Sequence, residues 1–179
     1  IGMGLYKAAC AARINGKAVD LRTPLTQDCQ VEILTFDHPD GRWAFRHTAS
    51  HILAQAVKRL YPQVKLAIGP AIDNGFYYDF DTEKPFTPED LAKIEGEMKK
   101  IVKENLPLER IEVSPEEARK LFEEAGEGYK VELIDEHSGK GEAITMYRQG
   151  EFVDLCAGPH LMSTGTVKAF KLTQCTGAY

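Results

Sequence analysis

The stretch RHTASHILAQAVKRLYP, residues 46–62, does most to decide how this sequence folds. Its apolar residues recur at the three- and four-residue spacing of one helix face, and the final proline stops a helix. We therefore predict a helix from about Trp43 to near Pro62. His47 and His51 lie four residues apart on it, so their side chains point in the same direction and can face one cavity.

On both sides of this helix the sequence alternates between strand and helix patterns. Residues 87–90 (TPED) and 114–117 (SPEE) each have a capping residue, a proline and an acid at the spacing of a helix start. The segments 37–41 and 135–142 are typical of loops. This order predicts an α+β fold with helices packed on a largely antiparallel sheet. Strands are predicted over residues 11–21 (a hairpin around Asn15-Gly16), 29–36, 64–69, 75–80, 108–113, 129–135, 143–149, 152–156 and 169–175.

Composition narrows the class of protein. Among 179 residues, 43% are hydrophobic, which allows a sizeable core, and no apolar run approaches the roughly 20 residues of a membrane helix. The net charge of −5 argues against a wide grip on nucleic acid phosphates, although not against contact with a few nucleotides. The four cysteines are scattered and no signal peptide opens the chain. We therefore expect a cytoplasmic protein with reduced cysteines and no membrane partner.

A second pair of reactive side chains stands four residues apart in DLCAGPH. Cys156 and His160 bracket a turn that follows a predicted strand. Taken alone, Cys156 is typical of a small buried hydrophobe. Together with His47 and His51, the pair makes a plausible tetrahedral zinc set. Spacing alone leaves two alternatives open: a zinc site and a metal-free catalytic cluster.

Other polar residues are ambiguous on pattern alone. Lys130, at the start of a predicted strand, is expected to be solvated, as most lysines are. Asp154 shares a strand face with Cys156, two residues on. Tyr77 and Tyr78 point to opposite faces, so one should be core and the other exposed or in a cleft.

The combination of motifs is far more specific than any of its parts. In this order and at these separations, RHTASHILAQAVKRLYP, IGPAIDNGFYYDFD, YKVELID, EFVDLCAGPH and FKLTQCTGAY resemble the amino-terminal region of bacterial threonyl-tRNA synthetases. Residues 1–36 resemble the later part of the small ubiquitin-like (TGS) module, which is β-grasp-like. Residues 37–179 resemble the editing domain. The resemblance implies that the synthetic active site, with its ATP and zinc, lies outside this chain.

The resemblance also implies an activity. The editing domain would hydrolyse mischarged seryl-tRNA(Thr), with the 3′ end of tRNA(Thr) carrying serine and the rest of the synthetase chain as partners. Serine lacks one methyl of threonine, a difference that binding alone discriminates only modestly, so a second, hydrolytic site is needed. No cofactor is implied for editing. The family's site positions fall on His47, His51, Tyr78, Lys130, Asp154, Cys156 and His160.

Two alternative functions stay open. A zinc-dependent alanyl-tRNA editing hydrolase would bind its metal through a similar set, here His47, His51, Cys156 and His160. From another class, the chain could be a non-catalytic tRNA-binding module. For the hydrolase we expect direct attack by water, not a covalent intermediate on Cys156, because the ester is already reactive.

Overall fold

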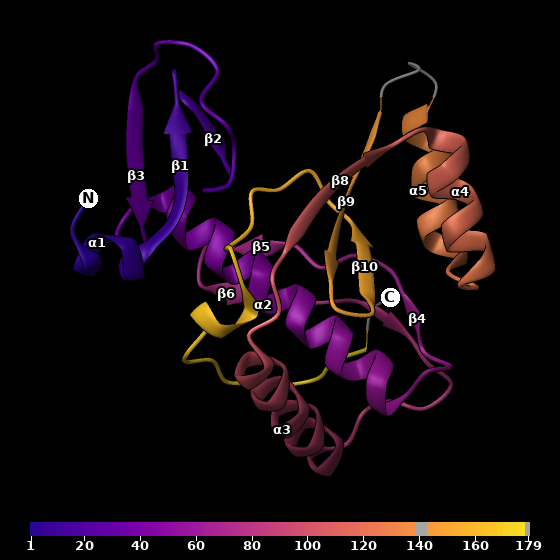
Figure 1. Ribbon diagram of the computed structural model, residues 1–179. Helices are drawn as coiled ribbons and strands as arrows, with labels where there is room; N and C mark the ends of the chain where they lie inside the picture. Colours follow the sequence, from indigo (N-terminus) through magenta and orange to yellow (C-terminus); the bar gives the residue numbers. More distant parts are fainter. Residues whose placement is uncertain (139–142, 178–179) are drawn as a thin grey trace.

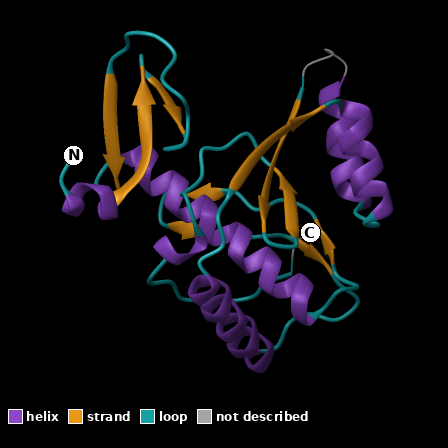
Figure 2. Cartoon of the chain, in the orientation of Figure 1, coloured by secondary structure: helices purple, strands orange, loops and turns teal. Residues whose placement is uncertain are grey.

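The computed structural model describes residues 1–138 and 143–177. Figure 1 shows a small sheet at the amino terminus, a long central helix, and a second sheet flanked by further helices. Helices and antiparallel strands alternate along the chain (Figure 2), which confirms the predicted α+β class. Among the described residues, no helix combines the length and the apolar character needed to cross a bilayer.

The amino-terminal module is a short helix followed by a three-stranded antiparallel sheet. The predicted hairpin is present, and both residues of its Asn15-Gly16 turn have positive φ, 47° and 86°, as a type I′ turn requires. The strand predicted over residues 29–36 is also found. The elements are α1 (Met3–Ala8), β1 (Ala9–Ile14), β2 (Lys17–Val19) and β3 (Val31–Thr35), in the sheet order β2-β1-β3.

The central helix α2 (Pro39–Leu60) ends where the sequence predicted but begins earlier. Part of the segment predicted as a loop, residues 37–41, is its first turn, because Pro39 occupies a first-turn position where a missing N–H costs nothing. Gly41 lets the helix approach the end of β3: a Cβ there would lie 2.0 Å from the carbonyl oxygen of Thr35. The helix is therefore fixed against the amino-terminal sheet at its start.

The two strands predicted over 64–69 and 75–80 form an interrupted antiparallel ribbon. It consists of four two-residue strands, β4 (Lys65–Leu66), β5 (Ala71–Ile72), β6 (Gly75–Phe76) and β7 (Phe80–Asp81). β4 pairs with β7 and β5 pairs with β6. One of the two neighbouring tyrosines is buried and the other exposed, as predicted; the buried one is Tyr78 and the exposed one Tyr77.

Both predicted helix starts are confirmed. α3 (Pro88–Glu104) and α4 (Pro115–Glu124) each open with a complete capping box. The second sheet has the antiparallel order β10-β9-β8 and is built from β8 (Glu109–Val113), β9 (Ile144–Gln149) and β10 (Phe152–Leu155).

Two predicted strands are wrong. Residues 129–135 belong to helix α5 (Gly128–His137), because Ile134 packs against Ala118 and Phe122 of α4 to form a helical hairpin. Residues 169–175 contain no strand; the segment follows the 3₁₀ turn η2 (Thr164–Thr166) and is held by Glu95 of α3, which accepts hydrogen bonds from Leu172 N and Lys171 Nζ. The loop predicted over 135–142 is helical as far as His137, and residues 139–142 lie outside the described part.

Candidate active site

The structure brings the two four-residue motifs together. His47 and His51 come from the middle of α2, and Cys156 and His160 from the turn after β10. One donor atom from each of these four residues lies within 4.8 Å of the others. The cysteine sulfur is 3.0 Å from Nε2 of His160 and 3.6 Å from the ring nitrogens of His47.

The three imidazoles are packed on one another and poorly solvated. The ring of His160 lies 4.5 Å from that of His47 and 4.4 Å from that of His51, measured between centroids. Burial lowers the pKa of His47 to about 4 and also lowers the pKa of His51 and of His160. All three rings are therefore neutral near pH 7 and can accept a proton or bind an ion.

The thiol of Cys156 is protonated in this setting. Burial raises its pKa, and the neighbouring carboxylate of Asp154 acts in the same direction. The sulfur accepts a hydrogen bond from the backbone N–H of Gly158, 3.2 Å away. This hydrogen bond and the charge of Lys130 lower the pKa, but the loss of hydration is the larger effect, so the thiolate is not the resting form.

A buried charged group lies behind the histidines. Lys130 Nζ is 2.7 Å from one carboxylate oxygen of Asp154, and the Tyr78 hydroxyl donates to the other at 2.6 Å. Lys130 also donates to the Tyr78 hydroxyl. His51 Nε2 is 3.6 Å from the Asp154 carboxylate, which connects this group to the imidazoles. Lys130 was expected to be solvated but is only 3% exposed. It lies in helix α5, on the same buried side as Ile134.

The cluster is partly accessible to solvent. His47 and Cys156 are partly exposed, whereas His51 and His160 are buried. The exposed indole of Trp43, one helical turn before His47, packs edge-on against its ring at 4.5 Å between centroids. A ligand would therefore meet Trp43, His47 and Cys156 first.

Sequence reasoning missed two residues at this site. Thr48 Oγ1 lies 2.9 Å from Nδ1 of His160 and accepts a hydrogen bond from the backbone N–H of Leu161. It thus fixes the orientation of His160. Trp43 could have been found from its position four residues before His47 on the same helix face, but Thr48 gave no comparable signal.

The four-residue cluster has the donor chemistry of a zinc site. Nitrogen and sulfur donors are those zinc prefers, and the contact between Thr48 and His160 resembles the outer hydrogen bonds that orient metal-bound histidines. Nδ1 of His51 is buried and has no hydrogen-bond partner among the described residues, so it is available to an ion or to water. The residues therefore fit both alternatives left open by the sequence.

Two domain families match parts of the chain. The TGS domain matches residues 1–35, and the threonyl and alanyl tRNA synthetase second additional domain matches residues 144–178. The threonine--tRNA ligases of Acetivibrio thermocellus and Clostridium tetani are each 63% identical to the chain over all 179 residues, and that of Clostridium botulinum is 62% identical. The chain spans 28% of the length of each of these relatives.

The fold, the clustered site and the two matched domains define the editing module of an aminoacyl-tRNA synthetase. Within that class, the chain corresponds over its whole length to the amino-terminal region of threonyl-tRNA synthetases, at 61–63% identity.

Proposed function

We propose that this chain hydrolyses seryl-tRNA(Thr), the mischarged product of a threonyl-tRNA synthetase, at the cluster of His47, His51, Cys156 and His160. The observation that carries the proposal is that a protonated thiol and neutral imidazoles meet at a partly exposed point, with the buried Lys130–Asp154–Tyr78 group behind them. Such a set can hold a water molecule and move a proton. The partners would be the 3′ end of tRNA(Thr) and the rest of the synthetase chain.

In the proposed reaction, water attacks the ester carbonyl of the seryl group. The bond between the carbonyl carbon and the ribose oxygen breaks, the water oxygen becomes part of the serine carboxylate, and the ribose oxygen gains a proton. His47, at the open side, contacts the terminal ribose, while Cys156 and His160 bound the water. Asp154 orients His51, and the burial of Lys130 in its ion pair with Asp154 favours an orienting role for the lysine too.

A direct attack fits the state of the cysteine. A nucleophilic Cys156 would have to be a thiolate, and burial works against that form. A rapid-quench experiment with labelled serine on the tRNA separates the two routes. We expect serine and free tRNA to appear together; label retained on Cys156 in acid would contradict direct attack.

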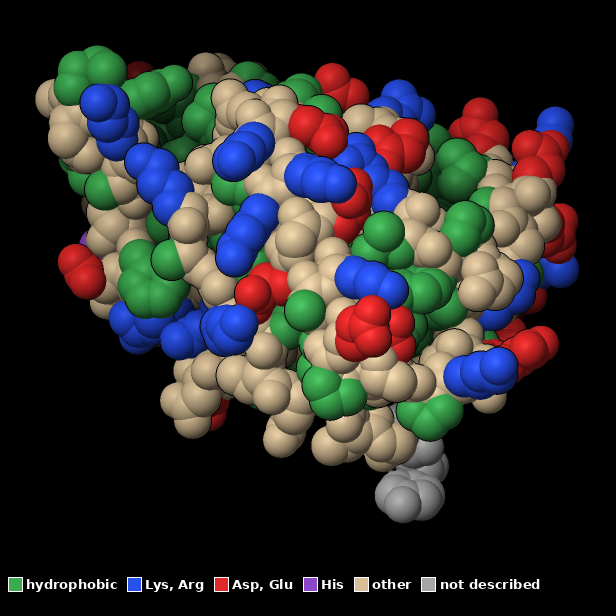
Figure 3. All heavy atoms as spheres, turned by 90° about the horizontal axis from the view of Figure 1, so that it is seen from below, with side chains coloured by type: hydrophobic (Ala, Val, Ile, Leu, Met, Phe, Trp, Pro, Cys, Tyr) green, Lys and Arg blue, Asp and Glu red, His purple; other side chains and the backbone are tan. Residues whose placement is uncertain are grey.

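Charge is distributed in a way that suits a small contact with the acceptor end. The chain as a whole has a net charge of −5. Even so, Lys and Arg side chains gather over the left half of the face shown in Figure 3, where Asp and Glu are sparse. The basic area would attract a few phosphates, while the net negative charge of the chain would not favour a hold on a long stretch of RNA.

Substrate selectivity tests the proposal. The chain would be offered seryl-tRNA(Thr) and threonyl-tRNA(Thr), and the release of each amino acid followed. We expect faster hydrolysis of the seryl ester, because the additional methyl of threonine would clash with the pocket or displace the water. Equal rates for the two esters, or activity on alanyl-tRNA alone, would refute the threonyl assignment.

The close approach of four donor atoms supports a second candidate, zinc-dependent hydrolysis of an aminoacyl-tRNA. His47, His51, Cys156 and His160 would hold the ion, which when bound would polarise a water molecule. We favour the metal-free pocket because the motifs of this chain resemble the threonyl enzymes more closely than the alanyl editing proteins.

A further inference from the structure

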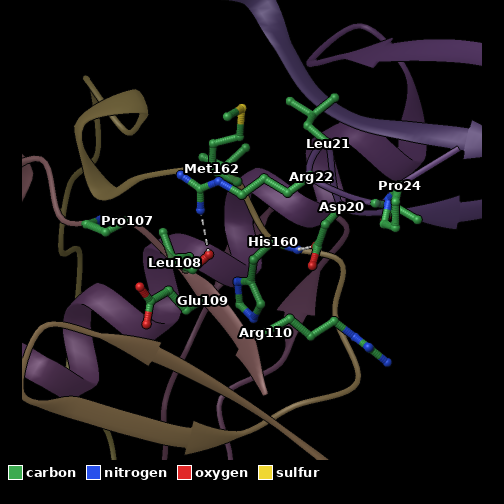
Figure 4. Close-up of a pocket in the computed structure, with 12 residues that line it drawn as sticks. Asp20, Leu21, Arg22, Pro24, Pro107, Leu108, Glu109, Arg110, His160 and Met162 are labelled. Carbon is green, nitrogen blue, oxygen red and sulfur yellow. Dashed lines mark hydrogen bonds between the residues drawn. The ribbon is translucent and has the colours of Figure 1, made fainter. Parts of the chain in front are cut away.

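One contact joins the amino-terminal module to the turn that carries Cys156 and His160. Asp20 directly follows β2 and begins a segment, residues 20–24, that lines a hollow of about 530 Å³. The opposite wall of the hollow is made by residues 107–110 and 160–162 (Figure 4). Asp20 points across this boundary toward the backbone of His160.

Both carboxylate oxygens of Asp20 are used. Oδ1 accepts a hydrogen bond of 2.8 Å from the backbone N–H of His160, and Oδ2 accepts one of 2.6 Å from the hydroxyl of Tyr147. His160 and Tyr147 are 1% and 2% exposed, so neither donor would easily find water instead. Bonds to a charged acceptor are stronger than bonds between neutral groups, and an unpaired buried donor is costly.

Tyr147, which is hydrogen-bonded to Asp20, itself contacts two residues of the turn, His160 and Gly158. Its ring packs edge-on against the imidazole of His160, with 4.4 Å between centroids. Its hydroxyl lies so close to Gly158 that a Cβ there would be 2.1 Å away. Gly158 in turn donates its N–H to the sulfur of Cys156. Asp20 therefore constrains the position of both functional side chains of the turn. It contacts His160 directly through the backbone, and it contacts Cys156 indirectly through Tyr147 and Gly158.

We propose that Asp20 is a positioning residue for the candidate active site, holding the 156–160 turn so that His160 and Cys156 face His47. The inference rests on the function proposed above. Asp20 contacts His160 through its backbone N–H and not its ring, so it acts through other residues and not on the substrate. The amino-terminal module is then part of the apparatus that sets the hydrolytic geometry.

The same segment supplies a matched control. Arg22, two residues further on, also crosses the boundary, where its Nη1 donates a 2.9 Å hydrogen bond to the carbonyl oxygen of Leu108 (Figure 4). That contact joins the same two parts of the molecule just before β8, without involving a residue of the 156–160 turn. Arg22→Ala therefore weakens the boundary without releasing His160.

The kinetic test compares Asp20→Ala, Asp20→Asn and Arg22→Ala in deacylation of seryl-tRNA(Thr). For Asp20→Ala we expect kcat to fall by about 10- to 100-fold, the scale of a small misplacement of reacting groups, with KM for the tRNA unchanged within about twofold. Asp20→Asn should stay close to the wild type, because its amide can still accept from His160 and can donate to Tyr147. Arg22→Ala should keep the wild-type kcat.

Tyr147→Phe extends the test and stands alone if Asp20→Ala does not fold: a kcat equal to that of the wild type would then overturn the proposal. The change removes one donor and leaves the bond from His160 to Asp20 in place. We expect a smaller loss of kcat than for Asp20→Ala, and no additional loss when the two changes are combined. Additive losses would show that the two residues act separately and would contradict the proposed chain of contacts.

Nitrogen-15 NMR of the histidine rings gives a readout that does not depend on activity. In Asp20→Ala the ring signals of His160 should shift, while those of the surface residues His38 and His137 stay unchanged. Unmoved His160 signals, wild-type kcat in Asp20→Ala, or an equal loss in Arg22→Ala would each overturn the positioning role. If the wild type itself fails to deacylate seryl-tRNA(Thr), the proposed function fails, and the NMR comparison still decides the role of Asp20.

Discussion

The buried pair of Lys130 and Asp154 allows a quantitative prediction for Lys130→Met, which keeps an unbranched side chain, one atom shorter, and removes its charge. At the observed separation of 2.7 Å, an effective dielectric constant of about 20 gives an attraction of about 6 kcal/mol. The variant no longer has to bury an ammonium group, and Asp154 keeps the hydrogen bonds from Tyr78 and the backbone N–H of Leu155. We therefore expect a net loss of about 3 kcal/mol, at the low end for breaking a buried ion pair.

Urea unfolding followed by circular dichroism measures this loss as a change in the free energy of unfolding. Lys120→Met is the matched control, because Lys120 is exposed and its nearest carboxylate, on Glu124, is 3.9 Å away. It should change stability by less than about 0.5 kcal/mol. The double variant Lys130→Met with Asp154→Asn should recover at least half of the loss, since no charge is then left buried. A cost for Lys130→Met no larger than that of the control would refute the reasoning.

Three further predictions concern the site and the stability of the fold. His47→Ala and Cys156→Ala should each lower the rate of deacylation of seryl-tRNA(Thr) by about 10²-fold or more, because each removes a proton acceptor or an oriented donor. Their circular dichroism spectra should be unchanged. A variant with the wild-type rate would show that its residue takes no part in the reaction. Arg59 lowers the pKa of Glu151 to about 2, so the stability this carboxylate contributes is complete above the unfolded value of about 4.3 and is lost as pH falls toward 2. Unfolding curves of Arg59→Met should therefore show a shallower loss of stability between these pH values than the wild type, and an equal slope would exclude this ion pair as a cause. Finally, the purified chain should deacylate at the same rate after treatment with a chelator; one zinc per chain, with activity lost on its removal, would favour the zinc-dependent mechanism instead.

Sequence patterns located the helices and most strands because their signals are local. Capping boxes mark the starts of α3 and α4, and Pro62 marks the end of α2 within two residues. The segment 129–135 was misread because Val131 and Leu133 alternate like a strand. Its helical state depends on contacts of Ile134 with α4, which no local pattern reveals.

The failed strand at 169–175 has a related cause. Phe170 and Leu172 alternate with polar residues and both pack against the core, as a strand would place them. The backbone N–H of Leu172, however, bonds to the side chain of Glu95 and not to a neighbouring strand. The alternating pattern thus correctly indicated which side chains are buried. It could not show that the backbone of this segment bonds to Glu95 of α3 and not to a neighbouring strand.

For the site, four-residue spacing indicated which side chains point the same way, and the structure brings both pairs together. The family resemblance supplied Lys130, Asp154 and Tyr78, whose mutual contacts join α5, β10 and the segment between β6 and β7. Asp20 could not be found in this way. It lies 140 residues from its partner His160, and a single aspartate after a strand carries no signal.

The core of the amino-terminal sheet has an unexpected member. Ala11 of β1 and Leu34 of β3 pack with Ala44, which belongs to α2 and not to the sheet. A helix of 22 residues is about 33 Å long, so α2 is one continuous element that packs against the small sheet at its start and carries His47 and His51 farther along. A change at Ala44 would loosen both modules together, and we expect the chain to unfold in one cooperative step.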